Sequence, residues 1–187
     1  MSLPHITAST SNASRPSAPE HAARGALLLA GSGVLLAGFH QAFDLSLGLP
    51  GHFGVFILAV LVLARASSPL AWAAVIATVG YLAGSAALAG AGGHKLLNLP
   101  GYLACAVVLD LAWRLSPALL RRPGLAAAVG GCAFLAKPLV LAALAGVLAL
   151  DAGALRHGLL LPLFSHAAFG AAGAAIGAIL WEGARPR

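Results

Sequence analysis

Histidine has the widest chemical range of any residue in this chain, and its seven copies are unevenly placed. Two lie in the polar N-terminal region, and the other five flank or enter apolar segments: His40, His52, His94, His157 and His166. Neutral imidazole binds Zn, Ni, Co and Cu, and a nearby carboxylate can orient it. We therefore consider His40, His52 and His94 as candidate metal ligands. Ordinary loop chemistry is the alternative, because the chain contains no HExxH or HxH motif.

Lys137 lies near the middle of a long apolar segment, where an ionised side chain costs about 2.5–3.5 kcal/mol on insertion scales. It needs a carboxylate, a water-filled cavity or a bound anion, or it must be neutral. Pro138 follows it, and we expect a kink there that frees backbone carbonyls. Splitting the segment in two at this point is the alternative, but both pieces would be too short to span a membrane.

The other polar residues at depth have simpler expected roles. His40 and Asp44 are four residues apart and share one helical face. His166 is expected about nine residues into the last helix, roughly 13 Å below the surface, facing a cavity. Asp110 is expected to pair with Arg114, four residues further along its own helix. The predicted substrate-binding residues are His40, Asp44, Asn98, Lys137 and His166.

No catalytic constellation is visible, and the chain is not expected to be an enzyme. Ser165 and His166 lack a placed acid, and neither a GxSxG motif nor a phosphate-binding loop is present. Without a nucleotide-binding motif the chain cannot drive transport with ATP on its own. Cys105 and Cys132 lie in apolar segments without a CxxC partner, so we expect them to be small buried apolar side chains.

These side chains need elements to position them, and composition indicates which. Hydrophobic residues make up 60% of the 187 and charged residues 9%, while mean hydropathy is +0.92. A folded chain with so few charged residues cannot cover its surface with polar groups, so its surface must be in contact with lipid. The prediction is an all-α integral membrane bundle of six transmembrane helices over residues 25–182, following a disordered tail (1–24) and preceding a short C-terminal tail (183–187). The predicted helices cover 25–43, 51–66, 69–91, 99–115, 124–149 and 158–181.

The basic residues indicate orientation. With both termini in the cytoplasm, eight arginines fall on the inner side, whereas only Lys95 and Arg156 fall on the outer side. Trp72, Trp113 and Trp181 also fall at inner helix ends, where an interfacial aromatic belt is expected. We therefore predict a multi-pass protein of the cell's inner (plasma) membrane. The net charge of +6 is scattered over helix ends rather than gathered in a stripe, which argues against a nucleic-acid partner.

Small residues recur every three or four positions in the first helix: Ala26, Ala30, Gly33 and Ala37. Such spacing lets helices approach closely, either within the chain or toward a partner. Farther along, the stretch from Leu99-Pro100-Gly101-Tyr102 to Val108-Leu109-Asp110-Leu111 begins with a Pro-Gly pair and ends in a Val/Leu-Asp-Leu turn.

This layout resembles the substrate-binding S components of energy-coupling factor (ECF) transporters, through its six helices, its small-residue first helix and its Pro/Gly-led fourth helix. The resemblance implies capture of a micronutrient, either a vitamin, a metal or a metal chelate. It also implies docking through Ala26, Ala30, Gly33 and Ala37 onto a transmembrane coupling subunit that works with ATPase subunits. The outer half lacks the tryptophans that often stack vitamin rings. A His-lined pocket with Lys137 beneath it would suit a metal chelate or an acidic organic ligand better than a flat neutral ring.

Two other functions stay open at this point. One is a membrane factor that handles metal or haem, which requires at least two of the five histidines to converge. The other is a structural subunit of a larger complex, with Lys137 facing a partner. A transition-metal ion is the one cofactor that the histidines suggest.

Overall fold

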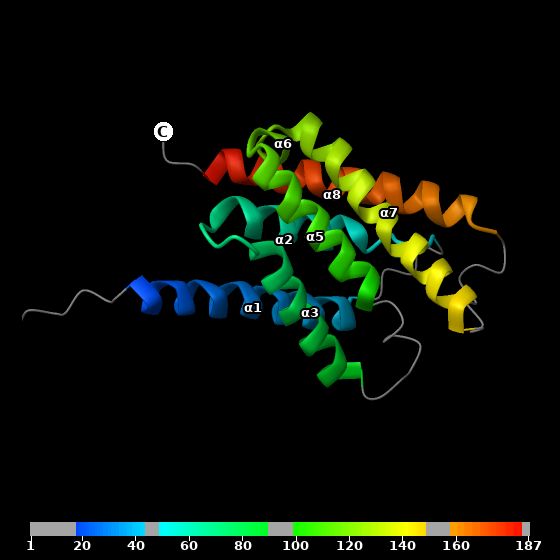
Figure 1. Cartoon of the computed structure of the whole chain (residues 1–187), viewed down its shortest axis with the longest axis horizontal. Coiled ribbons are helices and arrows are strands. Elements are labelled where there is room, and N and C mark those ends of the chain that lie inside the picture. The colour runs from blue at the N-terminus through cyan, green and yellow to red at the C-terminus, as the bar shows by residue number, and fades with distance from the viewer. Residues whose placement is uncertain (1–17, 44–48, 90–98, 149–157, 185–187) are drawn as a thin grey trace, which may run out of the picture.

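A computed structural model describes residues 18–43, 49–89, 99–148 and 158–184, and within these ranges the chain is helical with no strand (Figure 1). The predicted all-α class is therefore confirmed. The elements are α1 (Ala18–Ala42), α2 (Gly54–Ser67), α3 (Ala73–Ala89), α5 (Leu99–Leu115), α6 (Ala118–Arg121), α7 (Pro123–Leu148) and α8 (Leu160–Ala184).

The helix bounds differ from the prediction in instructive places. The first helix begins at Ala18 rather than at residue 25, so the last residues of the predicted tail are helical. Glu20 in its first turn complements the positive end of the helix dipole. The segment around Pro138 is one helix, α7, rather than two. The four-residue α6 before α7 was not predicted, and it follows Pro117, which is suited to a helix start.

Three helices are long and apolar enough to cross a membrane, namely α1, α7 and α8, while α2 and α3 are shorter apolar helices. Large apolar side chains are exposed on the outer faces of these helices, such as Leu28 (77%), Leu35 (76%) and Phe164 (76%). A surface of this kind is suited to lipid rather than water. The described part of the chain is therefore that of a membrane protein.

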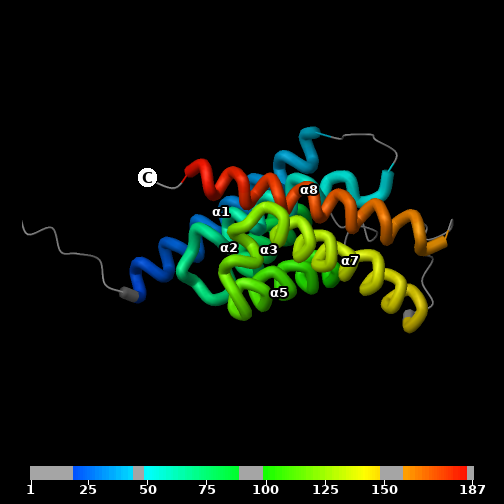
Figure 2. The backbone as a smooth tube through the Cα atoms, turned by 90° about the horizontal axis from the view of Figure 1, so that it is seen from above, coloured from blue at the N-terminus to red at the C-terminus, as the bar shows by residue number. Residues whose placement is uncertain are grey.

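The helices alternate in direction, which gives the bundle two distinct ends (Figures 1 and 2). The helices α1, α3 and α7 finish at one end of the bundle, which we name the histidine end because His40, His52 and His166 lie near it. The opposite end, where α2, α5 and α8 finish, is the arginine end. The described chain begins and finishes at the arginine end, since α1 starts there and α8 stops there (Figures 1 and 2).

Glycine at the crossing points sets how closely the helices approach. A Cβ on Gly33 of α1 would overlap the backbone of Ala77 and Tyr81 in α3, and one on Gly80 would overlap the backbone of Ala30. The same holds between α2 and α8, where a Cβ on Gly173 would lie 2.8 Å from the Cα of Val55. Small residues therefore bring these backbones into direct contact, as is usual where lipid supplies no hydrophobic driving force.

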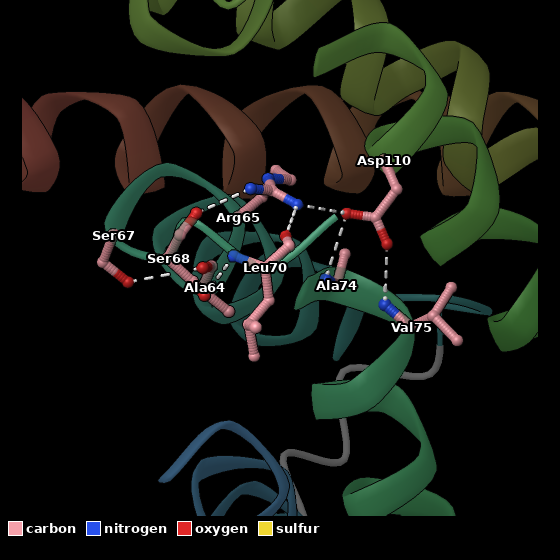
Figure 3. Close-up of polar contacts among 8 residues, drawn as sticks. All are labelled: Ala64, Arg65, Ser67, Ser68, Leu70, Ala74, Val75 and Asp110. Carbon is pink, nitrogen blue, oxygen red and sulfur yellow. Dashed lines mark hydrogen bonds and ion pairs between the residues drawn. The ribbon is translucent and has the colours of Figure 1, made fainter. Parts of the chain in front are cut away.

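An ion pair is buried at the arginine end, and it joins three helices (Figure 3). Asp110 of α5 accepts hydrogen bonds from the backbone N–H groups of Ala74 (3.2 Å) and Val75 (3.0 Å), so it caps the start of α3 from another helix. Arg65 of α2 donates to Asp110 over 3.3 Å and also to the carbonyls of Ser68 and Leu70.

The predicted Asp110–Arg114 pair is therefore wrong. The open N-terminus of α3 and the guanidinium of Arg65 together offer the carboxylate better donors than Arg114 on its own helix. Arg114 instead lies over the ring of Trp72, with its guanidinium carbon 3.9 Å from the ring centre.

Substitution at Asp110 tests this network. Asp110→Asn keeps the size of the side chain but leaves Arg65 as a buried, unbalanced cation, which should cost about 3–5 kcal/mol of stability. In a chain whose exposed Cys132 is replaced by alanine, thermal unfolding in detergent is followed by the reaction of a thiol dye with buried Cys105. Arg114→Met is the control at the same end and should change the midpoint little. An equal effect of the two substitutions would contradict the assignment.

Candidate functional site

A cavity of about 410 Å³ lies at the histidine end, between the end of α1, the turn before α2, the end of α3 and the start of α5, with α7 behind. This volume is within the range of about 300–1,000 Å³ that is usual for small-molecule sites. Its polar wall is made of His40 and Gln41 from α1, His52 from the turn, Tyr81 and Ser85 from α3, Tyr102 from α5 and Lys137 from α7. Phe53, Leu88 and Leu99 supply apolar surface.

Lys137 is the cation in the described wall of this cavity. It lies eleven residues before Leu148, the last residue of α7, which corresponds to about 16 Å along the helix axis. Its Nζ donates a hydrogen bond to the hydroxyl of Tyr102 over 2.8 Å and lies 4.5 Å from the centre of that ring. Gly101 makes room for it, because a Cβ there would lie 2.9 Å from the Cα of Lys137.

A row of contacting side chains leads from the cavity mouth to Lys137. The Nδ1 of His40 is hydrogen-bonded to the hydroxyl of Tyr81 over 2.7 Å, and its ring stacks on Phe53 with 3.8 Å between centres. The ring of Tyr81 meets the ring of Tyr102 edge to face at 5.4 Å. Because each ring is held by the next, this wall of the cavity is preorganised.

The turn over residues 49–53 closes the side of the cavity next to α8. Gly51 has a φ of 81°, a left-handed conformation that favours glycine. The next residue, His52, donates from Nδ1 to the carbonyl of Leu49 over 2.8 Å. Since that carbonyl only accepts, Nδ1 carries the proton, and Nε2 is an acceptor when the ring is neutral.

His166 supports this turn from behind. Its ring would lie 2.8 Å from a Cβ placed on Gly51, and its Nδ1 donates to the carbonyl of Pro162 over 2.7 Å. It lies six residues into α8, about 9 Å from the helix start, and is only 5% exposed. Gly51 lines the cavity, whereas His166 is not among the described lining residues and has its ring against Gly51. A role for His166 in substrate binding stays a prediction.

The other predicted site residues have mixed outcomes. His40, His52 and Lys137 meet on the cavity wall, whereas Asp44, Asn98 and His94 lie outside the described residues. Within the described ranges no three His, Cys, Asp or Glu side chains gather as a metal site, so the three-histidine set stays a prediction.

The predicted docking stripe on α1 faces α3 over much of its length. Gly33 and Ala37 are buried, and Ala30 is in contact with Gly80. This is the internal packing that the small-residue spacing also allowed. Docking of a partner through the stripe stays a prediction, and the freely exposed face of α1 carries leucines instead: Leu27, Leu28 and Leu35.

Sequence reasoning missed the tyrosines. The chain has two, Tyr81 and Tyr102, and both line the cavity. A hydroxyl inside an otherwise apolar helix usually finds a hydrogen-bond partner, and this was the available signal. Phe53 and Ser85 gave no comparable signal, because aromatic and small hydroxyl side chains are ordinary in apolar helices.

Alanine at Gly51 tests the support that His166 gives to the turn. Gly51→Ala should lower stability by about 1–2 kcal/mol through its φ, with an additional loss from overlap with the His166 ring. Gly158→Ala is the control, because Gly158 shares the left-handed φ (90°) but a Cβ there meets nothing within 4 Å. Adding His166→Ala should rescue part of the loss in the first variant only, as measured by thermal unfolding. Equal losses in the two single variants would disprove the contact.

Comparisons with known proteins give this chain no relative: no family model, curated protein or solved structure matches it.

Proposed function

We propose that the chain is the substrate-binding membrane subunit of an ECF-type transporter, which captures a small micronutrient at the histidine end. The observation that carries the proposal is the cavity, which enters the bundle at that end and reaches Lys137 near the middle of α7. A preformed cavity of this size, in which polar groups converge beside apolar surface, is typical of a small-molecule site.

The length of α2 supports a binding cavity open to water. Its 14 residues cover about 21 Å, less than the roughly 30 Å of a hydrocarbon core. In a six-span bundle, the turn over residues 49–53 then lies at membrane depth. Irregular backbone is tolerated there only when it is buried in protein or lines a water-filled cavity. This turn meets both conditions. Gly51 packs on His166, and the cavity is lined by Gly51, His52 and Phe53.

The two ends of the bundle support the proposed orientation. The arginine end carries Arg24, Arg65, Arg114, Arg121 and Arg122, and Trp72 and Trp113 lie beside Arg114 and Arg121. Cytoplasmic ends of membrane helices are enriched in such residues. We therefore propose six spans in the inner (plasma) membrane, with both termini in the cytoplasm and the cavity open to the outside.

ATP-driven transport would require partners, because this sequence has no nucleotide-binding motif. A transmembrane coupling subunit and ATPase subunits would be these partners. The exposed leucines of α1, beside the Ala26–Ala37 stripe, offer that coupling subunit an apolar face.

Blocking the cavity tests the binding function. Ser85 of α3 lines the cavity, whereas Ala83 on the same helix is exposed on the outside of the bundle. The purified chain is incubated with a panel of vitamins and metal ions and analysed by native mass spectrometry. We expect one compound to be retained by the native chain and by Ala83→Phe but lost from Ser85→Phe, because the added ring fills the site. The proposal fails if nothing is retained, or if Ser85→Phe retains the compound equally well.

Labelling of introduced cysteines tests the topology. Arg122→Cys and His94→Cys are made separately in a chain whose exposed Cys132 is replaced by alanine. In intact cells, a membrane-impermeant maleimide should label position 94 but reach position 122 only after permeabilisation. Labelling of both positions from the same side would exclude the six-span arrangement.

A further inference from the structure

We propose that the ligand of this cavity is a small organic anion whose carboxylate binds the Lys137 ammonium and the Tyr102 hydroxyl. This inference rests on the proposed binding function and adds the chemical class of the substrate. It comes from the contrast between two cations that the bundle holds inside, Arg65 and Lys137.

Arg65 has an acidic partner within the protein, and both terminal nitrogens of its guanidinium donate hydrogen bonds, whereas its Nε has no partner among the described residues. It is 2% exposed, pairs with Asp110 and donates to two backbone carbonyls. The chain thus follows the rule that a buried charge has an opposite charge and hydrogen bonds around it.

Lys137 is not matched in this way. Among the described residues its Nζ donates a hydrogen bond to the neutral hydroxyl of Tyr102 and lies 4.5 and 5.8 Å from the ring centres of Tyr102 and Phe134. No acidic residue is found among the described residues that line the cavity. Asp110 lies eight residues beyond Tyr102 on α5, about 12 Å along the axis, and is engaged by Arg65. An ammonium has three donors, so donors remain for an anion that enters from the cavity.

Tyr102 and Lys137 make a matched pair of donors for one carboxylate. Their polar atoms lie 2.8 Å apart, which is close enough for both to reach the same anion. Charge-assisted hydrogen bonds of this kind are among the strongest in proteins, more so in a site of low dielectric constant. The close approach at Gly101 holds the stem of Lys137 against α5 and fixes this geometry.

The rest of the cavity is suited to a flat organic body. Phe53 and His40 form a stacked pair at its wall, and Tyr81 stands edge-on to Tyr102. Ser85 and the Nε2 side of His52 offer a few polar contacts around these rings. A bare metal ion would meet the ammonium of Lys137, which repels it, so an organic anion matches the wall better.

Matched pairs of acids and amides test the charge of the ligand. The full chain in lipid nanodiscs is titrated with benzoate, nicotinate and indole-3-acetate, and with the primary amide of each, using calorimetry. We expect at least one acid to bind, and its amide to bind about ten-fold or more weakly, because the amide lacks the charge that Lys137 recognises. Amides that bind as tightly as the acids, or acids that all fail to bind up to about 10 mM, would overturn the proposal.

Variants assign the effect to Lys137. Lys137→Met should weaken binding of the acid by about ten- to a hundred-fold and abolish the preference over the amide, whereas Lys137→Arg should keep that preference. Arg114→Met removes a cation at the far end of the bundle and should leave both affinities unchanged. A purely structural lysine would not alter the preference for acid, so an unchanged preference in Lys137→Met refutes the assignment.

The outcome can be separated from that of the proposed function. If the native chain retains a neutral compound that Ser85→Phe loses, the binding function stands and the anionic class is wrong. If Ser85→Phe binds the acids as well as the native chain does, the cavity itself is not the binding site and both proposals fail.

Discussion

Neutralising charge inside an apolar bundle is the constraint on which the rest of this structure depends. In a medium of low dielectric constant a cation without a partner is expensive, so its partners determine where helices must meet. At the arginine end, Arg65, Asp110 and the first backbone N–H groups of α3 satisfy one another. That single network fixes the relative positions of α2, α3 and α5. Lys137 has no acidic partner among the described residues that line the cavity, and it lies on the wall of that cavity.

The helices pack closely where small residues face each other, and they leave a cavity where larger polar and aromatic residues face each other. Where glycine and alanine face each other, as between α1 and α3 or between α7 and α8, backbones touch and no space remains. Toward the histidine end, His40, Tyr81 and Tyr102 replace the small residues, and the helices enclose a cavity. Gly51, Gly54 and Gly101 are exceptions there. Each admits a side chain against the backbone and so shapes the wall: His166 at Gly51, Phe134 at Gly54 and Lys137 at Gly101.

Much of the fold followed from apolar segment length and from breakers. The predicted segments correspond to α1, α2, α3, α5, α7 and α8, with shifts of a few residues at most ends and of seven at the start of α1. Part of the site was predictable as well, because the ionised side chain of a lysine such as Lys137 has a high insertion free energy inside an apolar segment. The tyrosines were missed because single side chains in apolar helices carry no periodic signal. Asp110 was assigned to Arg114 because only neighbours on the same helix can be judged from spacing.

The sequence by itself determined that this protein is helical and suited to lipid, since composition and segment length depend on no contact. It also determined that Lys137 lies inside an apolar segment, and that most arginines and most histidines lie near opposite ends of the helices. Only the tertiary structure decided three contacts. Arg65 forms an ion pair with Asp110, Lys137 donates a hydrogen bond to Tyr102, and the ring of His166 packs against Gly51. The physical reason is that these contacts join residues 35 to 115 positions apart. Helix crossing points bring them together, and no local pattern encodes those crossings.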